Sequence, residues 1–192
     1  MIRLIIFDVD GTLARKFSLV LLPNVERFFQ LVLNGNCSFR PKLAIATNQG
    51  GVGMRHWMES EGFGKPQKYP TEESIEERIQ GLIDALGTDQ ELRIYASYRY
   101  KNKQGLWAPV PSGEERNPRW SKSWRKPEPG MLLQAMIDAG VSAEETLYIG
   151  DREEDKKAAQ AAGCAFTWAE NFFSRDWTNC DQLSNLMDHT LG

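Results

Sequence analysis

The sequence predicts an α/β protein in which a parallel β-sheet is sandwiched between helices. Two observations support this fold class. Short apolar runs alternate with amphipathic stretches along the 192-residue chain, which is the pattern of strands joined by helical crossovers. The composition, with 41% hydrophobic and 26% charged residues, is that of a globular protein whose length suffices for a sizeable core. We therefore expect a single domain over residues 1–192.

The amino-terminal half contains two predicted strands and two predicted helices. Residues 3–7 consist of an arginine and four apolar residues in a row, which predicts a buried strand, and 43–46 predict a second strand. Between them, Pro23 opens a helix whose apolar positions share one face and end near Gly35. Thr71 precedes an acidic turn and an apolar stripe that ends at the next glycine, so it is the expected N-cap of a long helix.

The carboxyl-terminal half alternates more regularly. Residues 92–98 alternate between apolar and polar side chains, which predicts a third strand. The stretches 130–139 and 153–162 are amphipathic or alanine-rich, and each is followed by a glycine that can end a helix. The apolar runs 146–149 and 164–168 follow these patterns and predict the fourth and fifth strands.

Two stretches lack a clear period and are predicted to be long loops, at 50–70 and 100–125. The second is unusual in its charge. From residue 98 to residue 126 there are eight basic and two acidic residues, a net charge of +6, while the whole chain carries −3. This asymmetry predicts that the loop meets an anion.

Membrane insertion is not expected, because no apolar run approaches the roughly 18 residues that a spanning helix needs. The three cysteines are Cys37, Cys164 and Cys180. Their odd number and the lack of a CxxC pair predict free thiols, and hence a cytoplasmic protein, rather than a disulfide framework or a structural zinc site.

Polar residues follow three of the predicted strands. These strand-end residues are Asp8 and Asp10, Thr47 and Asn48, and Asp151 with Asp155 four positions later. Each segment alone is also compatible with an ordinary turn or a helix N-terminus. Together they are expected at one edge of the sheet, because ligands of open parallel sheets bind at the carboxyl ends of strands.

The chemistry of this set is specific. Four converging carboxylates would repel one another unless a cation lay among them, and carboxylates suit Mg²⁺. Lys126, just ahead of a predicted helix, supplies a fixed positive charge. The arrangement is suited to holding a phosphoryl group against Mg²⁺ while a carboxylate attacks it.

The four segments resemble the four motifs of the haloacid dehalogenase (HAD) superfamily of phosphohydrolases. DVDGT, TNQG, RKPEPGM and GDREED occur in that order and span residues 8–155. The motifs TNQGG and RKPxPGM are similar to those of one branch of the superfamily. That branch contains heptose-bisphosphate phosphatase, histidinol-phosphate phosphatase and the 3′-phosphatase of polynucleotide kinase. The resemblance implies a Rossmann-like sheet.

The resemblance also implies roles for the residues. Asp8 would be the nucleophile that becomes an aspartyl-phosphate, and Asp10 the acid for the leaving oxygen and then the base for water. Thr47 and Lys126 would hold the phosphoryl oxygens. The expected Mg²⁺ ligands are Asp8, the main-chain carbonyl of Asp10, and Asp151, with Asp155 in support. Further phosphate or substrate contacts are expected from Thr12, Asn48 and Arg125.

The chain also departs from these relatives. No cysteine lies between Cys37 and Cys164, so the zinc loop that usually precedes the RKP motif in the heptose-bisphosphate and histidinol-phosphate relatives is not expected. The basic, aromatic loop insert of about 98–125 takes its place. One helix nearly fills the segment between the first two motifs, so no large cap domain is expected there and the active site should be open.

The loop composition bears on the substrate. Basic residues bind phosphates and aromatic faces stack on bases, which predicts a nucleic-acid 3′-phosphate end or a nucleotide as substrate. The stacking candidates are Trp107, Trp120 and Trp124, and the phosphate-contact candidates are Arg116, Arg119 and Lys122. Equally, these aromatics could pack the loop onto the domain.

Several alternatives stay open at this stage. They are a small sugar-phosphate or bisphosphate substrate, phosphotransfer to an acceptor other than water, and a non-catalytic phosphate-binding domain. The retained set of converging charges argues against the last of these. The sequence leaves the oligomeric state open and is compatible with a monomer.

Overall fold

The computed structural model describes residues 1–34, 37, 40–87 and 92–188. A five-stranded sheet lies at its centre, with strand order β3-β2-β1-β4-β5 and every pairing parallel. The strands are β1 (Leu4–Phe7), β2 (Lys42–Asn48), β3 (Arg93–Ser97), β4 (Thr146–Gly150) and β5 (Ala165–Trp168). The predicted α/β fold and its five strands are confirmed.

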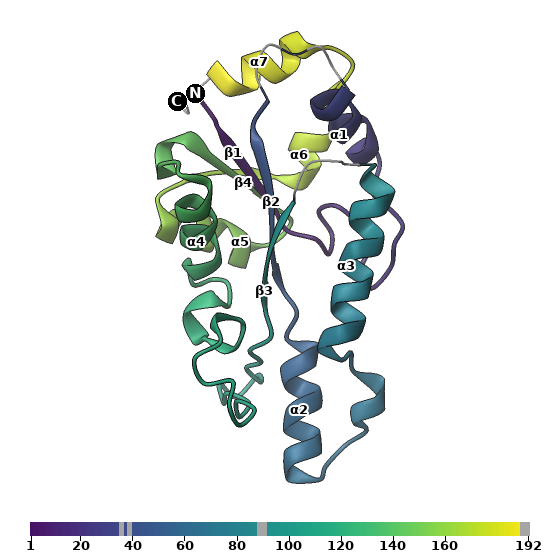
Figure 1. Cartoon of the computed structure of the whole chain (residues 1–192), viewed down its shortest axis with the longest axis vertical. Helices are drawn as coiled ribbons and strands as arrows, with labels where there is room; N and C mark the ends of the chain where they lie inside the picture. The colour runs from purple at the N-terminus through teal and green to yellow at the C-terminus, as the bar shows by residue number, and fades with distance from the viewer. Residues whose placement is uncertain (35–36, 38–39, 88–91, 189–192) are drawn as a thin grey trace.

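Helices cover both faces of the sheet (Figure 1). One face packs against α1 (Val25–Asn34), α3 (Glu72–Leu86) and α6 (Ala169–Phe173), and the other against α4 (Gly130–Ala139) and α5 (Glu153–Ala162). The alternation of side chains along β1 explains this division: Ile5 and Phe7 belong to the first core, and Leu4 and Ile6 to the second. Near α1, α7 (Cys180–Asp188) contributes Leu183 to the first core.

The predicted capping signals are confirmed in α3. The Thr71 side chain accepts a hydrogen bond from the Ser74 amide at 3.1 Å, and Ser74 Oγ accepts one from the Thr71 amide at 2.9 Å. The helix ends where Gly87 adopts the left-handed conformation with φ of 64°. Among the helices of the described ranges, none is long and apolar enough to cross a membrane.

The predicted loop at 50–70 is wrong. It contains α2 (Gly51–Glu61) and a 3₁₀ turn, η1 (Pro66–Lys68), and α2 extends beyond the carboxyl ends of the strands (Figure 1). The three glycines at 50, 51 and 53 suggested a loop, but Gly53 is needed for close packing of the helix. A Cβ at this position would collide with the Tyr98 carbonyl, so glycine lets the helix approach the chain beyond β3 closely.

The 98–125 region is packed rather than open. It contains two 3₁₀ turns, η2 (Pro118–Trp120) and η3 (Lys122–Trp124). Trp120 is buried against Tyr98, and Trp124 packs on Tyr95. Trp120 is therefore not available for stacking on a base and was wrong as a stacking candidate, whereas Trp124 is half-buried and its stacking role stays a prediction.

The prediction of three free thiols is wrong as well. Cys37 and Cys180 form a disulfide with their Cα atoms 5.3 Å apart, and Cys164 is a free thiol. The two bonded cysteines are separated by 143 residues, and only the packing of α7 near α1 brings them together. Spacing along the chain carries no sign of such a pair.

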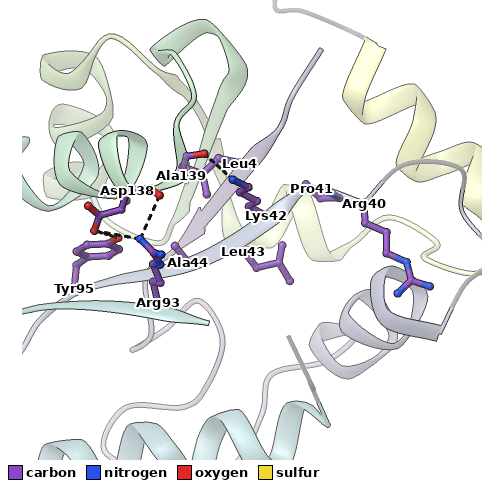
Figure 2. Close-up of a pocket in the computed structure, with 11 residues that line it drawn as sticks. Leu4, Arg40, Pro41, Lys42, Leu43, Ala44, Arg93, Tyr95, Asp138 and Ala139 are labelled. Atoms are coloured by element: carbon purple, nitrogen blue, oxygen red, sulfur yellow. Dashed lines mark hydrogen bonds and ion pairs between the residues drawn. The ribbon is translucent and has the colours of Figure 1, made fainter. Parts of the chain in front are cut away.

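A small cavity of about 380 Å³ lies at the amino ends of the strands (Figure 2). Lys42 donates a hydrogen bond to the carbonyl of Ala139 at 2.7 Å. Arg93 and Tyr95 both reach Asp138, with the Tyr95 hydroxyl 2.8 Å from its carboxylate. These contacts connect the end of α4 to the sheet.

Candidate active site

The larger cavity of about 790 Å³ lies at the opposite edge, where β1 and β2 end. Because β1 is central and its neighbours are reached by connections over opposite faces, this edge is the usual place for a ligand in an open parallel sheet. Its walls come from the loops after β1 and β2, from α2 and α3, and from the 98–126 region. Predicted site residues in its lining are Asp8, Asp10, Thr47, Asn48, Arg125 and Lys126.

The ammonium group of Lys126 is buried at the centre of this edge. Its Nζ lies 2.7 Å from Asp8 Oδ1, 2.7 Å from Asp155 Oδ1, 2.7 Å from the Tyr148 hydroxyl and 2.9 Å from the Ala46 carbonyl. The Lys126 side chain is 1% exposed. A buried ammonium needs opposite charge and acceptors around it, and these four groups provide both.

The loop that carries Lys126 is fixed by Asn48. The Asn48 side-chain amide donates to the Lys126 carbonyl at 3.0 Å, and its oxygen accepts from the Lys126 amide at 3.0 Å. This pair connects the end of β2 to the chain ahead of α4. Asn48, predicted to bind phosphate, is thus engaged in holding the lysine in place.

The start of α5 is organised by Asp155, which is 1% exposed. Its Oδ2 accepts from the amides of Asp151 at 3.2 Å and Arg152 at 3.0 Å. Its Oδ1 accepts from the Tyr148 hydroxyl at 2.9 Å. A carboxylate at a helix N-terminus is stabilised in this way by otherwise unpaired amides.

Three carboxylates form a candidate metal site. Single oxygens of Asp8, Asp151 and Asp155 lie within 4.8 Å of one another. Asp151 Oδ1 is buried and has no hydrogen-bond partner in the described structure, as expected of a ligand oxygen that awaits a cation. Gly11, with φ of 92°, lies against this carboxylate, and any side chain there would occupy its place. The oxygen ligands present fit Mg²⁺.

The charges of this group are unbalanced. Three carboxylates face the single ammonium of Lys126. Burial raises the pKa of Asp8 to about 6, and the neighbouring Asp155 adds to the effect while Lys126 opposes it. Burial alone would lower the pKa of Lys126, but Asp8 and Asp155 outweigh it and raise that pKa. Burial and Asp155 also raise the pKa of Asp151. A divalent cation would balance the excess negative charge.

Asp10 lies beside this group in a different environment. Arg78 of α3 donates to both of its oxygens, at 2.7 and 3.3 Å, and Gln49 donates to Oδ2 at 3.2 Å. The amide of Phe17, a residue with φ of 57°, donates to Oδ1 at 3.0 Å. Burial opposes ionisation, but these donors lower the pKa of Asp10 overall. These contacts favour the ionised form of Asp10 and hold its carboxylate in position.

The remaining predicted residues differ in placement. Thr47 is buried and its hydroxyl accepts from Gln49 at 3.0 Å. The Arg125 guanidinium lies against Gly50 and lines the cavity, with Nη1 2.9 Å from the Arg99 carbonyl. Thr12 does not reach the cavity: its buried side chain lies in a separate hollow beside α6 and is not placed for the phosphate contact expected of it.

Three residues of the site were not predicted. Gln49 belongs to the TNQG segment, and its position two residues after Thr47 could have indicated that it is part of the site. Tyr148 lies within the apolar run of β4, where nothing marks a hydroxyl that reaches Lys126. Arg78 occupies a polar position of an amphipathic helix, where an arginine is ordinarily solvated, so no local pattern indicates its contact with Asp10.

Comparisons with known proteins agree with this geometry. A family model described as HAD-hydrolase-like matches residues 123–171. Phosphoglycolate phosphatase 1 of Pseudomonas aeruginosa is 26% identical, over 88% of this chain and 71% of its own length.

Among solved structures, D,D-heptose 1,7-bisphosphate phosphatase from B. bronchiseptica, complexed with magnesium and phosphate, shares the fold. Its TM-score is 0.59 with 18% identity, over 96% of this chain and 99% of its own. Together with the four motifs and the edge of the sheet where they converge, these findings show that the chain has the fold of HAD-type phosphatases and is similar to them in sequence.

Proposed function

We propose that the protein hydrolyses phosphomonoesters with Mg²⁺ through an aspartyl-phosphate on Asp8. The observation that carries this proposal is the arrangement around Asp8: a buried carboxylate whose Oδ1 contacts Lys126, beside two further carboxylates. A nucleophile, a fixed positive charge and a set of cation ligands then meet at one point in the cavity. Phosphoryl transfer requires this combination.

The first half-reaction forms the bond between a carboxylate oxygen of Asp8 and phosphorus, while the ester bond between phosphorus and the leaving oxygen breaks. Asp10 takes up a proton from the monoanionic phosphate ester as the ester binds, and passes that proton to the leaving oxygen. Lys126 and Thr47 contact the phosphoryl oxygens and stabilise their charge. Mg²⁺, held by Asp8, Asp151, Asp155 and the carbonyl of Asp10, would supply the remaining charge neutralisation.

The second half-reaction returns Asp8 to its starting form. Asp10, now ionised, accepts a proton from a water molecule whose oxygen bonds to phosphorus, and the acyl-phosphate bond breaks to release inorganic phosphate. The donors around Asp10 lower its pKa, which supports a role as base in this step, and Arg78 and Gln49 hold its orientation. General-base catalysis of this kind contributes roughly 10²–10⁴-fold.

The substrate that we favour is a small phosphorylated metabolite. The cavity of about 790 Å³ suits a small molecule. The similar proteins act on phosphoglycolate and on a heptose bisphosphate, as their names state. The predicted nucleic-acid substrate has less support, because Trp120, one of its three stacking candidates, is buried in the fold.

The decisive test compares two aspartates at opposite edges of the sheet. Asp8→Asn keeps the shape but removes the nucleophile and one cation ligand, so phosphate release from an aryl phosphate should fall to background. Asp138→Asn, at the amino ends of the strands, should retain activity. Phosphate release by Asp8→Asn at the native rate, or full native activity in excess chelator, contradicts the mechanism.

The substrate class is tested with the native chain and Mg²⁺. Sugar phosphates, phosphorylated hydroxy acids and oligonucleotides with a 3′- or 5′-phosphate are compared by kcat/KM. Preference for a small metabolite supports the proposal. Preference for an oligonucleotide end would contradict the proposal and support the nucleic-acid substrate predicted from the loop composition.

A further inference from the structure

A short hairpin follows β3 and presents two side chains on one face. Its strands are joined by an antiparallel bridge between Lys101 and Trp107. The Ala108 amide donates to the Tyr100 carbonyl at 3.0 Å. Since side chains alternate along an extended strand, Arg99 lies on the same face as Lys101. The hairpin thereby brings two cationic side chains to one indole ring.

A third cation reaches the same ring from η3. The positive groups of Arg99, Lys101 and Lys122 lie 5.3, 5.4 and 5.4 Å from the centre of the Trp107 indole. Each is within the distance of a cation–π contact. Three like charges around one ring repel one another, and no ion pair with a carboxylate is recorded for any of them across the described residues.

Arg99 is the informative member of this group. It is only 5% exposed, whereas the two lysines are exposed. Its Nη1 donates to the Ala108 carbonyl at 2.7 Å, but its Nε is buried without an acceptor. Burial lowers the pKa of the Arg99 guanidinium, and no carboxylate opposes the effect. A buried charge without a counter-charge is costly, which indicates that an anion belongs there.

We propose that Arg99, Lys101 and Lys122 bind a phosphate oxyanion beside Trp107, at a site outside the lining of the catalytic cavity. The guanidinium supplies directional donors that match phosphate oxygens, and the lysines supply mobile charge. The indole ring is the common contact of the three cations. Since cations already lie against this ring, an oxyanion fits the site better than a stacked base.

The site adjoins the catalytic cavity through the main chain. The Arg99 carbonyl accepts a hydrogen bond from Arg125, which lines that cavity, and the next residue, Tyr100, lines it too. The proposed anion site and the wall of the catalytic cavity therefore share neighbouring residues of one strand. The proposal does not depend on Asp8 chemistry, because it concerns binding alone.

The test uses the full-length chain and a signal local to the site. The indole N–H resonance of Trp107, assigned with Trp107→Phe, is followed while inorganic phosphate is added at low ionic strength. The native resonance should shift with a saturable curve. Lys101→Gln combined with Lys122→Gln should weaken the apparent affinity about tenfold, since each exposed ionic contact contributes up to about fivefold.

Lys103→Gln is the matched control. It lies in the same hairpin, is exposed and removes the same charge, but has no recorded contact with the Trp107 ring. It should leave the affinity within about twofold of the native value. If Lys103→Gln weakens binding as much as either single change at Lys101 or Lys122, or if the native resonance does not respond to phosphate, the site does not exist.

A second arm identifies the source of the phosphate group. A short oligonucleotide without a terminal phosphate offers phosphodiesters alone. A shift with inorganic phosphate only assigns the site to free or monoester phosphate, and a shift with the oligonucleotide assigns it to a phosphodiester backbone. A resonance that is silent to both contradicts the proposal, provided that circular dichroism shows the chain folded.

Discussion

The two edges of the sheet use similar residues under opposite conditions. At the amino ends, Arg93 and Asp138 lie 3.7 Å apart, with their side chains 50% and 30% exposed (Figure 2). At the carboxyl ends, Lys126 and Asp155 lie 2.7 Å apart, and each side chain is 1% exposed. The chemical groups are alike, but one pair is in water and the other is not.

This difference separates charges that support the fold from charges that carry chemistry. An exposed pair contributes about 0–1 kcal/mol, and here it helps Lys42 attach the end of α4 to the sheet. A buried group of charges loses hydration and is weak evidence for stability. Where such a group is retained with more negative than positive charge, we infer that a ligand completes it.

The largest expected effect follows from removing the buried ammonium. Lys126→Met leaves Asp8 and Asp155 buried without a counter-charge, so the free energy of unfolding should fall by about 3–5 kcal/mol, and phosphatase activity should be lost. Urea denaturation without Mg²⁺ measures the first effect. If Lys126→Met is as stable as the native chain, the desolvation of the buried charges costs as much free energy as their mutual attraction contributes.

The second effect concerns Asp10. Asp10→Asn keeps the main-chain carbonyl, so Mg²⁺ binding should persist while turnover falls by roughly 10²–10⁴-fold. The loss should be smallest for aryl phosphates, whose leaving groups need no proton. Arg78→Gln should give a smaller loss with the same dependence on leaving group. An equal loss for all leaving groups would argue against Asp10 as the general acid.

Mg²⁺ should give a smaller effect on stability that depends on pH. The folded-state pKa of Asp8 is raised to about 6 from 3.8, so without the cation this group destabilises the fold as pH rises through that range. Mg²⁺ must displace the proton below pH 6. Its addition should therefore raise Tm by several degrees at pH 8 and by less at pH 5.

The control for this experiment is Asp151→Asn, which replaces a ligand oxygen that otherwise has no partner. It should reduce the Mg²⁺-dependent rise in Tm at pH 8. If Mg²⁺ raises the Tm of this variant as much as that of the native chain, the cation binds elsewhere.

The smallest effect is expected at the amino edge. Arg93→Gln removes an exposed pair with Asp138 and should lower the free energy of unfolding by at most about 1 kcal/mol, with kcat unchanged. Urea denaturation alongside Lys126→Met gives the comparison directly. A loss of 3 kcal/mol or more at Arg93 would remove the distinction between the two edges.

The sequence predicted the elements whose local signals agree with their packing. Four of the strands were found from apolar runs, which occur because both faces of the sheet are covered, and β3 was found from its alternation. The helix after Thr71 was found from its cap and stripe. In contrast, α2 was missed, because glycines that serve close packing at Tyr98 also suggest a loop.

The sequence predicted those site residues that come directly after a strand. Asp8, Asp10 and Thr47 could be placed at one edge because strand ends coincide in a parallel sheet. The contact between Arg78 and Asp10 joins residues 68 positions apart from different elements, and the disulfide joins residues 143 apart. Such pairs depend on how helices pack, and no local pattern encodes them.

The immobility of Lys126 has a consequence for selectivity. Its four short contacts and the Asn48 pair hold the ammonium at one place. A phosphoryl oxygen that contacts Lys126 has to replace one of these acceptors at that place. A phosphatase that acts through this site should therefore be strict about the geometry of the transferred group and tolerant of the rest of the substrate.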